Sequence, residues 1–196
     1  MKKCLFLCLV IIVTFWCSGA VALSDSYKNN IFAPGVLKAI DSDGILKAGE
    51  IAPNFNLRSV AGDFISLEQF LGKKNVIISF IPAAWTPVCS DQWPGYNIVK
   101  DLFDKNDAIL IGISVDNIPT LFAWTQQMGN LWFPVCSDFY PHGKVANSYG
   151  VLRSDGVAER AIFIINKKGI VHYAKVYDIN KRPPLENIIT ELEKIK

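Results

Sequence analysis

The sequence predicts an α/β fold in which one mixed central sheet is flanked by helices. Short apolar runs rich in β-branched residues occur at 76–81, 108–115 and 161–165, and such runs are typical of strands buried on both faces. Stretches with helical spacing of apolar residues separate or follow these runs. A turn sequence after the third run predicts a hairpin, which makes the sheet mixed rather than purely parallel.

The first 22 residues are expected to be a leader for export. Lys2 and Lys3 precede an uncharged apolar run that ends in Ala20-Val21-Ala22, the small residues that a signal peptidase reads. Cleavage there would start the mature chain at Leu23 and place it in the periplasm or outside the cell. The alternative is an uncleaved membrane anchor over residues 4–24, a length barely sufficient to cross a bilayer.

Residues 23–47 are predicted to form an N-terminal arm, a short segment or one helical turn laid over the domain. Pro34, Gly35 and Gly44 interrupt this stretch. Residues 48–196 are expected to form one domain, because 51% of the 196 residues are hydrophobic, 19% are charged and no internal linker is visible.

Removal of the leader would change both the charge balance and the number of thiols. Of 20 basic and 18 acidic residues, 18 of each would remain, and this balance gives no indication of a nucleic-acid partner. Only Cys89 and Cys136 would remain of the five cysteines, too few for a disulfide scaffold. The two histidines have no partner at metal-ligand spacing, so the sequence predicts no metal and no cofactor.

The first half of the domain has the pattern of a βαβ unit. Between the runs 76–81 and 108–115, Val99, Leu102 and Phe103 share one face of a predicted helix. Pro94, earlier in the same stretch, is expected to kink that helix, because proline lacks an N–H and crowds the preceding turn.

The second half supplies another helix, a hairpin and a closing helix. Asn117 can cap a helix that has Pro119 in its first turn and ends at Gly129. The sequence at 166–169 predicts a hairpin turn into a strand over 170–177. A closing amphipathic helix is indicated by one apolar stripe, Leu185, Ile188, Ile189, Leu192 and Ile195. This order of elements is that of the thioredoxin fold.

Cys89 follows the first strand at the point where the chain becomes helical. Unpaired N–H groups and the positive end of the helix dipole stabilise a thiolate in the first turn of a helix. A thiolate is the nucleophile that peroxide chemistry needs. The alternative interpretation is a buried packing residue, the commoner role of a lone cysteine among apolar residues.

Pro82, Thr86 and Cys89 have the spacing Pro-x-x-x-Thr-x-x-Cys, and Arg160 opens the strand that ends near residue 165. This combination resembles the active-site signature of the peroxiredoxins, the alkyl hydroperoxide reductase and thiol-specific antioxidant family. The resemblance extends over residues 49–196, and it favours the functional interpretation of Cys89.

The resemblance implies a thiol-dependent peroxidase that reduces hydrogen peroxide or organic hydroperoxides through a sulfenic acid on Cys89. It implies that Thr86 presents its hydroxyl to the peroxide and that Pro82 shields the sulfur from water. Arg160 would hold the thiolate and bind the peroxide oxygens. Gln92 would support that arginine without neutralising it. An external thiol or thioredoxin-like reductant would complete the cycle, and a homodimer is expected from the resemblance.

Cys136 has two interpretations. Core packing is favoured, because related chains have an aliphatic residue at the end of the same short strand. Alternatively, Cys136 could be a resolving residue that attacks the sulfenic acid of Cys89 to form a disulfide. The favoured interpretation, core packing of Cys136, predicts an enzyme that uses one cysteine, Cys89.

Two other functions compete with the peroxidase. An exported thioredoxin-like thiol-disulfide oxidoreductase would use the same loop, but Thr86 stands where dithiol exchange needs a second cysteine. A catalytically silent binding protein on the thioredoxin fold is the other alternative, since a fold does not by itself specify an activity.

Overall fold

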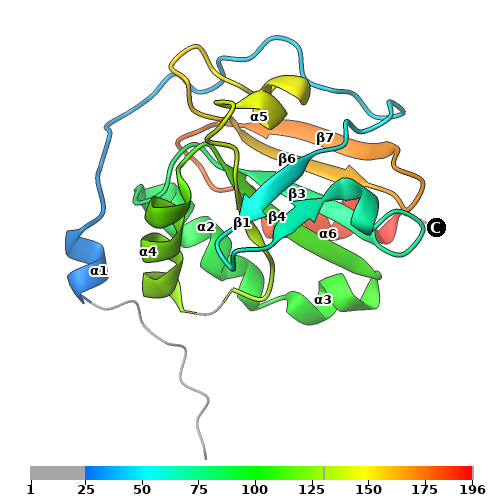
Figure 1. The fold of residues 1–196 in the computed structure, drawn as a ribbon, viewed down its shortest axis with the longest axis horizontal. Helices are drawn as coiled ribbons and strands as arrows, with labels where there is room; N and C mark the ends of the chain where they lie inside the picture. Colours follow the sequence, from blue (N-terminus) through cyan, green and yellow to red (C-terminus); the bar gives the residue numbers. More distant parts are fainter. Residues whose placement is uncertain (1–24, 130, 196) are drawn as a thin grey trace, which may run out of the picture.

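The computed structural model describes residues 25–129 and 131–195, which form a seven-stranded mixed sheet with helices on both faces (Figure 1). The strands follow one another across the sheet in the order β2-β1-β5-β4-β3-β6-β7. Their bounds are β1 Asn56–Ser59, β2 Phe64–Ser66, β3 Asn75–Phe80, β4 Ala108–Ser114, β5 Val135–Ser137, β6 Arg160–Ile165 and β7 Val171–Tyr177.

Helices α2, α3, α4 and α6 cover one face of the sheet and α5 covers the other (Figure 1). Their bounds, with those of α1 and the 3-10 helix η1, are α1 Asp25–Asn29, η1 Leu67–Gln69, α2 Pro87–Asn97, α3 Lys100–Lys105, α4 Ile118–Met128, α5 Lys144–Ser148 and α6 Leu185–Glu193. The predicted α/β class is confirmed.

The strands predicted from apolar runs form the centre of the sheet. β3 lies between its parallel neighbour β4 and its antiparallel neighbour β6, and all residues of β3 and β6 are buried. β6 and β7 form the predicted antiparallel hairpin. All four strands begin and end within one residue of the predicted bounds. For β3, β4 and β6 the reason is that a central strand covered on both faces carries a continuous apolar signal, whereas the edge strand β7 is marked by the turn before it.

The sheet separates the core into two clusters. On β3, Ile77 packs with α2, α4 and α6, whereas Val76 and Ile78 pack with α5. This alternation is the two-residue period of a strand. Cys89 belongs to the first cluster and Cys136 to the second. The two thiols therefore lie on opposite sides of the sheet.

Two predicted helices differ in detail from the structure. The single crossover helix is two helices, since α2 ends at Asn97 and Val99 caps α3. Pro94 lies inside α2, one turn before this break. The closing helix ends at Glu193, so Ile195 packs against the core from beyond the helix. The cap at Asn117 and the end at Gly129 are confirmed for α4.

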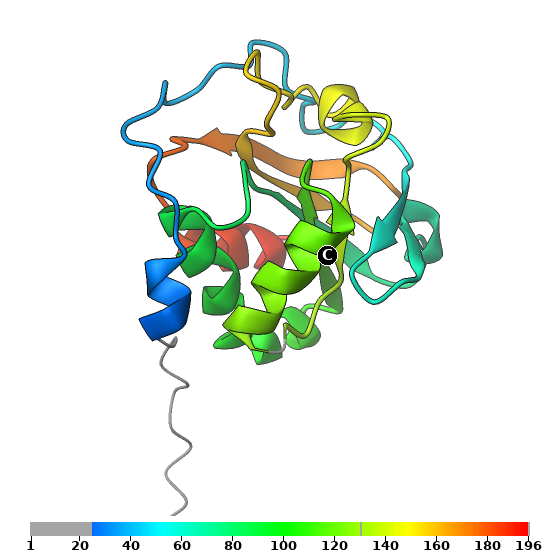
Figure 2. The ribbon, with the colours of Figure 1, turned by 60° about the vertical axis from the view of Figure 1, so that its left-hand side comes forward.

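The arm begins with α1 and continues as extended chain along the domain (Figure 2). Tyr27 of α1 is buried, and its ring centroid lies 5.9 Å from that of Trp85, in the loop before α2. The leader expected over residues 1–22 and the alternative anchor over residues 4–24 lie outside the described residues. Within 25–129 and 131–195, none of the helices has the length and apolar character needed to span a bilayer.

Candidate active site

Cys89 is the third residue of α2. Thr86 is the N-cap in an extended conformation, and Pro87 is the first residue of the helix. The N–H that proline lacks would have no acceptor within the helix at this position, so no hydrogen bond is lost. The sulfur therefore lies in the first helical turn, among backbone N–H groups without a helical acceptor. Cys89 is fully buried. The prediction that this cysteine lies at a helix start is confirmed.

Arg160 meets Cys89 because of the sheet register. β3 and β6 are antiparallel, with Phe80 paired to Ala161, so the start of β6 lies beside the end of β3, from which the Cys89 loop leaves. Arg160 Nη2 lies 3.4 Å from Cys89 Sγ, and the arginine is 1% exposed. The contact places a permanently cationic group against a buried sulfur.

The other contacts of the Arg160 guanidinium are to neutral oxygens. Nη1 donates to Gln92 Oε1 at 2.5 Å, and Nη2 and Nε donate to the carbonyl oxygen of Ile179 at 2.9 and 3.2 Å. The Gln92 amide in turn donates to the hydroxyls of Ser79 and Tyr96, at 3.1 and 3.0 Å. Gln92 thus orients the guanidinium without cancelling its charge, as the sequence predicted.

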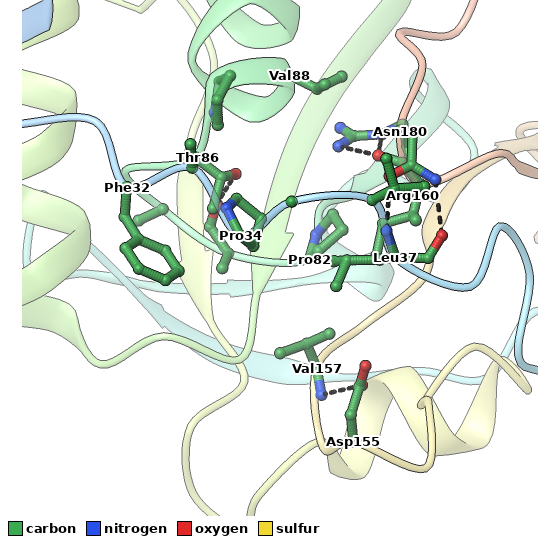
Figure 3. Close-up of a pocket in the computed structure, with 17 residues that line it drawn as sticks. Phe32, Pro34, Leu37, Pro82, Thr86, Val88, Asp155, Val157, Arg160 and Asn180 are labelled. Atoms are coloured by element: carbon green, nitrogen blue, oxygen red, sulfur yellow. Dashed lines mark hydrogen bonds between the residues drawn. The ribbon is translucent and has the colours of Figure 1, made fainter.

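Pro82, Thr86 and Arg160 line one pocket of about 570 Å³ (Figure 3). Cys89 is not among the lining residues, and Arg160 connects the pocket to its sulfur. The Thr86 hydroxyl donates to the carbonyl oxygen of Ala83 at 2.9 Å, which leaves its oxygen able to accept a hydrogen bond. The structure thus brings together all four residues of the predicted signature. The opposite wall comes from residues 32–37 of the arm, which the sequence did not place near the site.

Two further residues shape the loop that carries Thr86, and sequence reasoning missed both. Asp116, just after β4, accepts hydrogen bonds from the Ala84 N–H at 2.7 Å and the Ser114 hydroxyl at 2.5 Å. Trp85 has φ of +60°, a region that residues other than glycine rarely occupy. Asp116 could have been identified as a polar residue at the carboxyl end of a buried strand. No feature of the sequence indicates the unusual backbone conformation of Trp85.

Cys136 lies away from this site. It is fully buried on β5, among the residues that pack with α5. Burial raises the pKa of the Cys136 thiol to about 12, with a smaller effect from Asp63, so this sulfur is protonated at neutral pH. Both Cys89 and Cys136 are free thiols. Their places on opposite faces of the sheet favour the packing interpretation of Cys136.

Metal ligands do not gather at this site or elsewhere in residues 25–129 and 131–195, where no group of three His, Cys, Asp or Glu side chains could hold an ion.

Comparison with known proteins identifies similar chains. Residues 48–174 match the AhpC/TSA family. The chain is 35% identical over 133 residues to "Alkyl hydroperoxide reductase E" of Mycobacterium tuberculosis, a match that covers 67% of this chain and 86% of that protein. It is 30% identical over 160 residues to "2-cysteine peroxiredoxin, chloroplastic" of Chattonella marina var. antiqua, covering 77% and 81%. Among solved structures, the reduced 2-Cys peroxiredoxin of Plasmodium vivax matches with a TM-score of 0.71 at 29% identity, over 76% of this chain and 82% of that one.

Proposed function

The chain belongs to the AhpC/TSA family of peroxiredoxins, which are thiol-dependent peroxidases, and we propose that Cys89 is the residue that peroxide oxidises. The observation that carries this proposal is the 3.4 Å contact between the Cys89 sulfur and the buried guanidinium of Arg160. Among the described residues, no other cysteine sulfur is held against a cation at a helix start.

The proposed reaction transfers one oxygen atom to sulfur. The Cys89 thiolate attacks one oxygen of a hydroperoxide, an S–O bond forms, and the O–O bond breaks. The departing oxygen takes a proton and leaves as water or an alcohol, and Cys89 is left as a sulfenic acid. Arg160 stabilises the charge as it moves from sulfur to the departing oxygen. The Thr86 oxygen accepts a hydrogen bond from the peroxide, and Pro82 keeps water from the sulfur.

We propose a one-cysteine cycle, in which an external thiol reduces the sulfenic acid. The first thiol forms a mixed disulfide with Cys89 and releases water, and a second thiol frees Cys89 and leaves as the disulfide. This version is supported by the place of Cys136 behind the sheet, where its thiol is protonated at neutral pH. Hydrogen peroxide and organic hydroperoxides are both proposed as substrates.

Single-cysteine variants test this assignment. After one equivalent of hydrogen peroxide, mass spectrometry with a sulfenic-acid trap is expected to find the adduct on Cys89 in the wild type and in Cys136→Ser. The trap is expected to find none in Cys89→Ser. A disulfide between Cys89 and Cys136 in the wild type would contradict the one-cysteine cycle. Oxidation of neither sulfur would contradict the role of Cys89.

The two competing functions are not favoured. A thioredoxin-like oxidoreductase needs a second thiol in the loop, and Thr86 occupies that position. A silent binding protein would not need a buried guanidinium held against a cysteine sulfur. An insulin reduction assay run beside a peroxide consumption assay separates these functions. Insulin reduction without peroxide consumption would contradict the peroxidase proposal.

Export and dimer formation are further proposals. Export rests on the sequence of residues 1–22, and N-terminal sequencing of the mature chain is expected to begin at Leu23. A chain that keeps Met1 would contradict cleavage. Dimer formation rests on the family, and analytical ultracentrifugation of the reduced protein is expected to give twice the mass of one chain.

A further inference from the structure

The pocket that Arg160 lines beside Cys89 is much larger than hydrogen peroxide requires. Its volume of about 570 Å³ is in the range of pockets that hold small organic molecules, roughly 300–1,000 Å³. A water molecule occupies only about 30 Å³ in the liquid, and hydrogen peroxide has just one oxygen more. Space is therefore left over once a peroxide group has been placed beside Arg160.

The walls around this extra space are apolar. Only four of the lining residues have polar side chains, namely Thr86, Asp155, Arg160 and Asn180, and all four are engaged within the protein. The rest of the lining is glycine and apolar residues, including Phe32, Pro34 and Leu37 of the arm (Figure 3). Phe32 is 68% exposed although its ring is apolar, so much of its surface is available to a ligand.

The arm is fixed beside Arg160. The Asn180 side chain accepts a hydrogen bond from the Leu37 N–H at 3.0 Å and donates one to the Leu37 carbonyl at 2.9 Å. The next residue back, Ile179, donates its N–H to the Ala39 carbonyl at 2.9 Å. Its own carbonyl accepts from the Arg160 guanidinium. The segment 179–180 therefore holds the arm and the arginine together.

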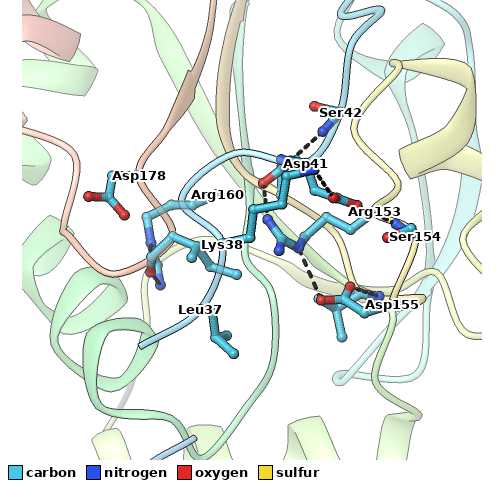
Figure 4. A network of polar contacts seen from close by, with 12 residues as sticks. Leu37, Lys38, Asp41, Ser42, Arg153, Ser154, Asp155, Arg160 and Asp178 are labelled. Atoms are coloured by element: carbon cyan, nitrogen blue, oxygen red, sulfur yellow. Dashed lines mark hydrogen bonds and ion pairs between the residues drawn. The ribbon is translucent and has the colours of Figure 1, made fainter. Parts of the chain in front are cut away.

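The arm is also tied to both flanks of the site. At its start, the Phe32 N–H donates to the carbonyl oxygen of Trp85 at 2.7 Å. Beyond the pocket, one carboxylate oxygen of Glu159 accepts the N–H groups of Asp41 and Ser42, at 2.5 and 2.8 Å. The other oxygen of Glu159 is paired with Arg153 at 2.9 Å. Arg153, Asp41 and Ser42 are labelled in the polar network of Figure 4. Since Glu159 and Arg153 are buried, this attachment is shielded from water.

We propose that residues 32–37 of the arm form a binding wall for the apolar substituent of an organic hydroperoxide whose O–O group lies at Arg160. This inference rests on the proposed peroxidase function and adds to it the residues, 32–37 of the arm, that would set the preference between organic hydroperoxides and hydrogen peroxide. The arm precedes residues 48–174, the part that matches the family, so this selectivity would come from outside the family domain. Apolar contact with the wall favours binding of an alkyl or aryl group, whereas hydrogen peroxide has no such group.

The test compares two peroxides on one variant. Phe32→Ser combined with Leu37→Ser removes two apolar side chains but leaves the backbone hydrogen bonds of both residues in place. Stopped-flow tryptophan fluorescence gives the second-order rate constants for oxidation by cumene hydroperoxide and by hydrogen peroxide. The ratio of the first constant to the second is expected to fall about tenfold in the double variant, in line with the loss of apolar contacts in a binding pocket.

The matched control is Ile40→Ser, a similar change on the arm at a residue that does not line the pocket; it is expected to keep the wild-type ratio. Phe32→Ser alone provides a second, milder variant. An unchanged ratio in both pocket variants overturns the binding wall while the peroxidase function stands. Equal loss of both rate constants also overturns it. A wild type that reacts with neither peroxide overturns the peroxidase function itself, and the wall with it.

Discussion

Arg160 contributes a charge that few buried residues could supply. Its Nη1, Nη2 and Nε atoms donate to the oxygens of Gln92 and Ile179, which carry no net charge. The positive charge is therefore available to the sulfur of Cys89, the remaining contact. Lysine could supply charge at this place but not the planar fork of donors that reaches Gln92, Ile179 and the sulfur at once.

Substitution of Arg160 is expected to impair oxidation of Cys89 more than it impairs folding. Arg160→Met should lower the second-order rate constant with hydrogen peroxide by about 10²–10³-fold, because the charge that stabilises the departing oxygen is lost. Arg160→Lys should recover part of that loss. Stopped-flow fluorescence measures the rates, and Arg58→Lys on β1 is the control. A rate within twofold of wild type in Arg160→Met would contradict the assignment.

At the scale of elements, α2 is seated on the sheet through a glycine. Gly112 of β4 lies under the Trp93 ring of α2, and a Cβ at this position would lie 2.7 Å from the ring atom Cζ2. Trp93 is fully buried between α4 and the sheet, so it has little room to move. The distance of Cys89 from β6 therefore depends on the close approach that glycine permits.

Gly112→Ala is expected to destabilise the protein and to slow the reaction. Overpacking at this contact should cost about 1–3 kcal/mol of unfolding free energy, measured by urea denaturation. The shift of α2 should also lower the rate of Cys89 oxidation, since it moves the sulfur relative to Arg160. Gly44→Ala is the matched control, because a Cβ there has no atom within 4 Å. Equal stabilities of the two variants would refute the close approach.

Elements differ in how well the sequence predicts them. β3, β4 and β6 could be predicted because burial imposes long apolar runs, and β7 because a turn sequence precedes it. The candidate site at Cys89 is indicated by the fixed spacing of Pro82, Thr86 and Cys89, whereas Arg160 is added by the family resemblance. The hairpin of β1 and β2 could not be predicted, since strands of four and three residues carry too short a pattern. The position of the arm could not be predicted either, because its hydrogen-bond partners, Glu159 and Asn180, lie more than 100 residues away in the chain.

At the scale of the whole molecule, the two-sided core buries groups that ionise only at high pH. Burial raises the pKa values of the Cys136 thiol and of the Tyr149 and Tyr177 hydroxyls. Below pH about 7.5 these groups are protonated in both the folded and the unfolded chain, since a free thiol has a pKa of about 8.5 and a free phenol of about 10. At higher pH the unfolded chain loses protons that the folded chain retains, so unfolding becomes more favourable.

We therefore expect the free energy of unfolding to fall as the pH rises from 8 to 10.5. Urea denaturation at several pH values measures the slope. Cys136→Ala lacks one of the groups responsible, so its slope should be shallower than that of the wild type even if its stability at pH 8 is lower. Identical slopes in the two proteins would show that Cys136 does not contribute.

The sheet between the two thiols has a consequence for the lifetime of the oxidised protein. In the proposed one-cysteine cycle, an oxidised Cys89 would form no disulfide with Cys136, because the two residues lie on opposite faces of the seven-stranded sheet. The oxidised form would persist until a reducing molecule arrives from outside. A second peroxide arriving first would carry the sulfur on to sulfinic acid, which ordinary thiols do not reverse. Whether each molecule is reduced or over-oxidised would then depend on whether a reductant or a second peroxide reaches Cys89 first.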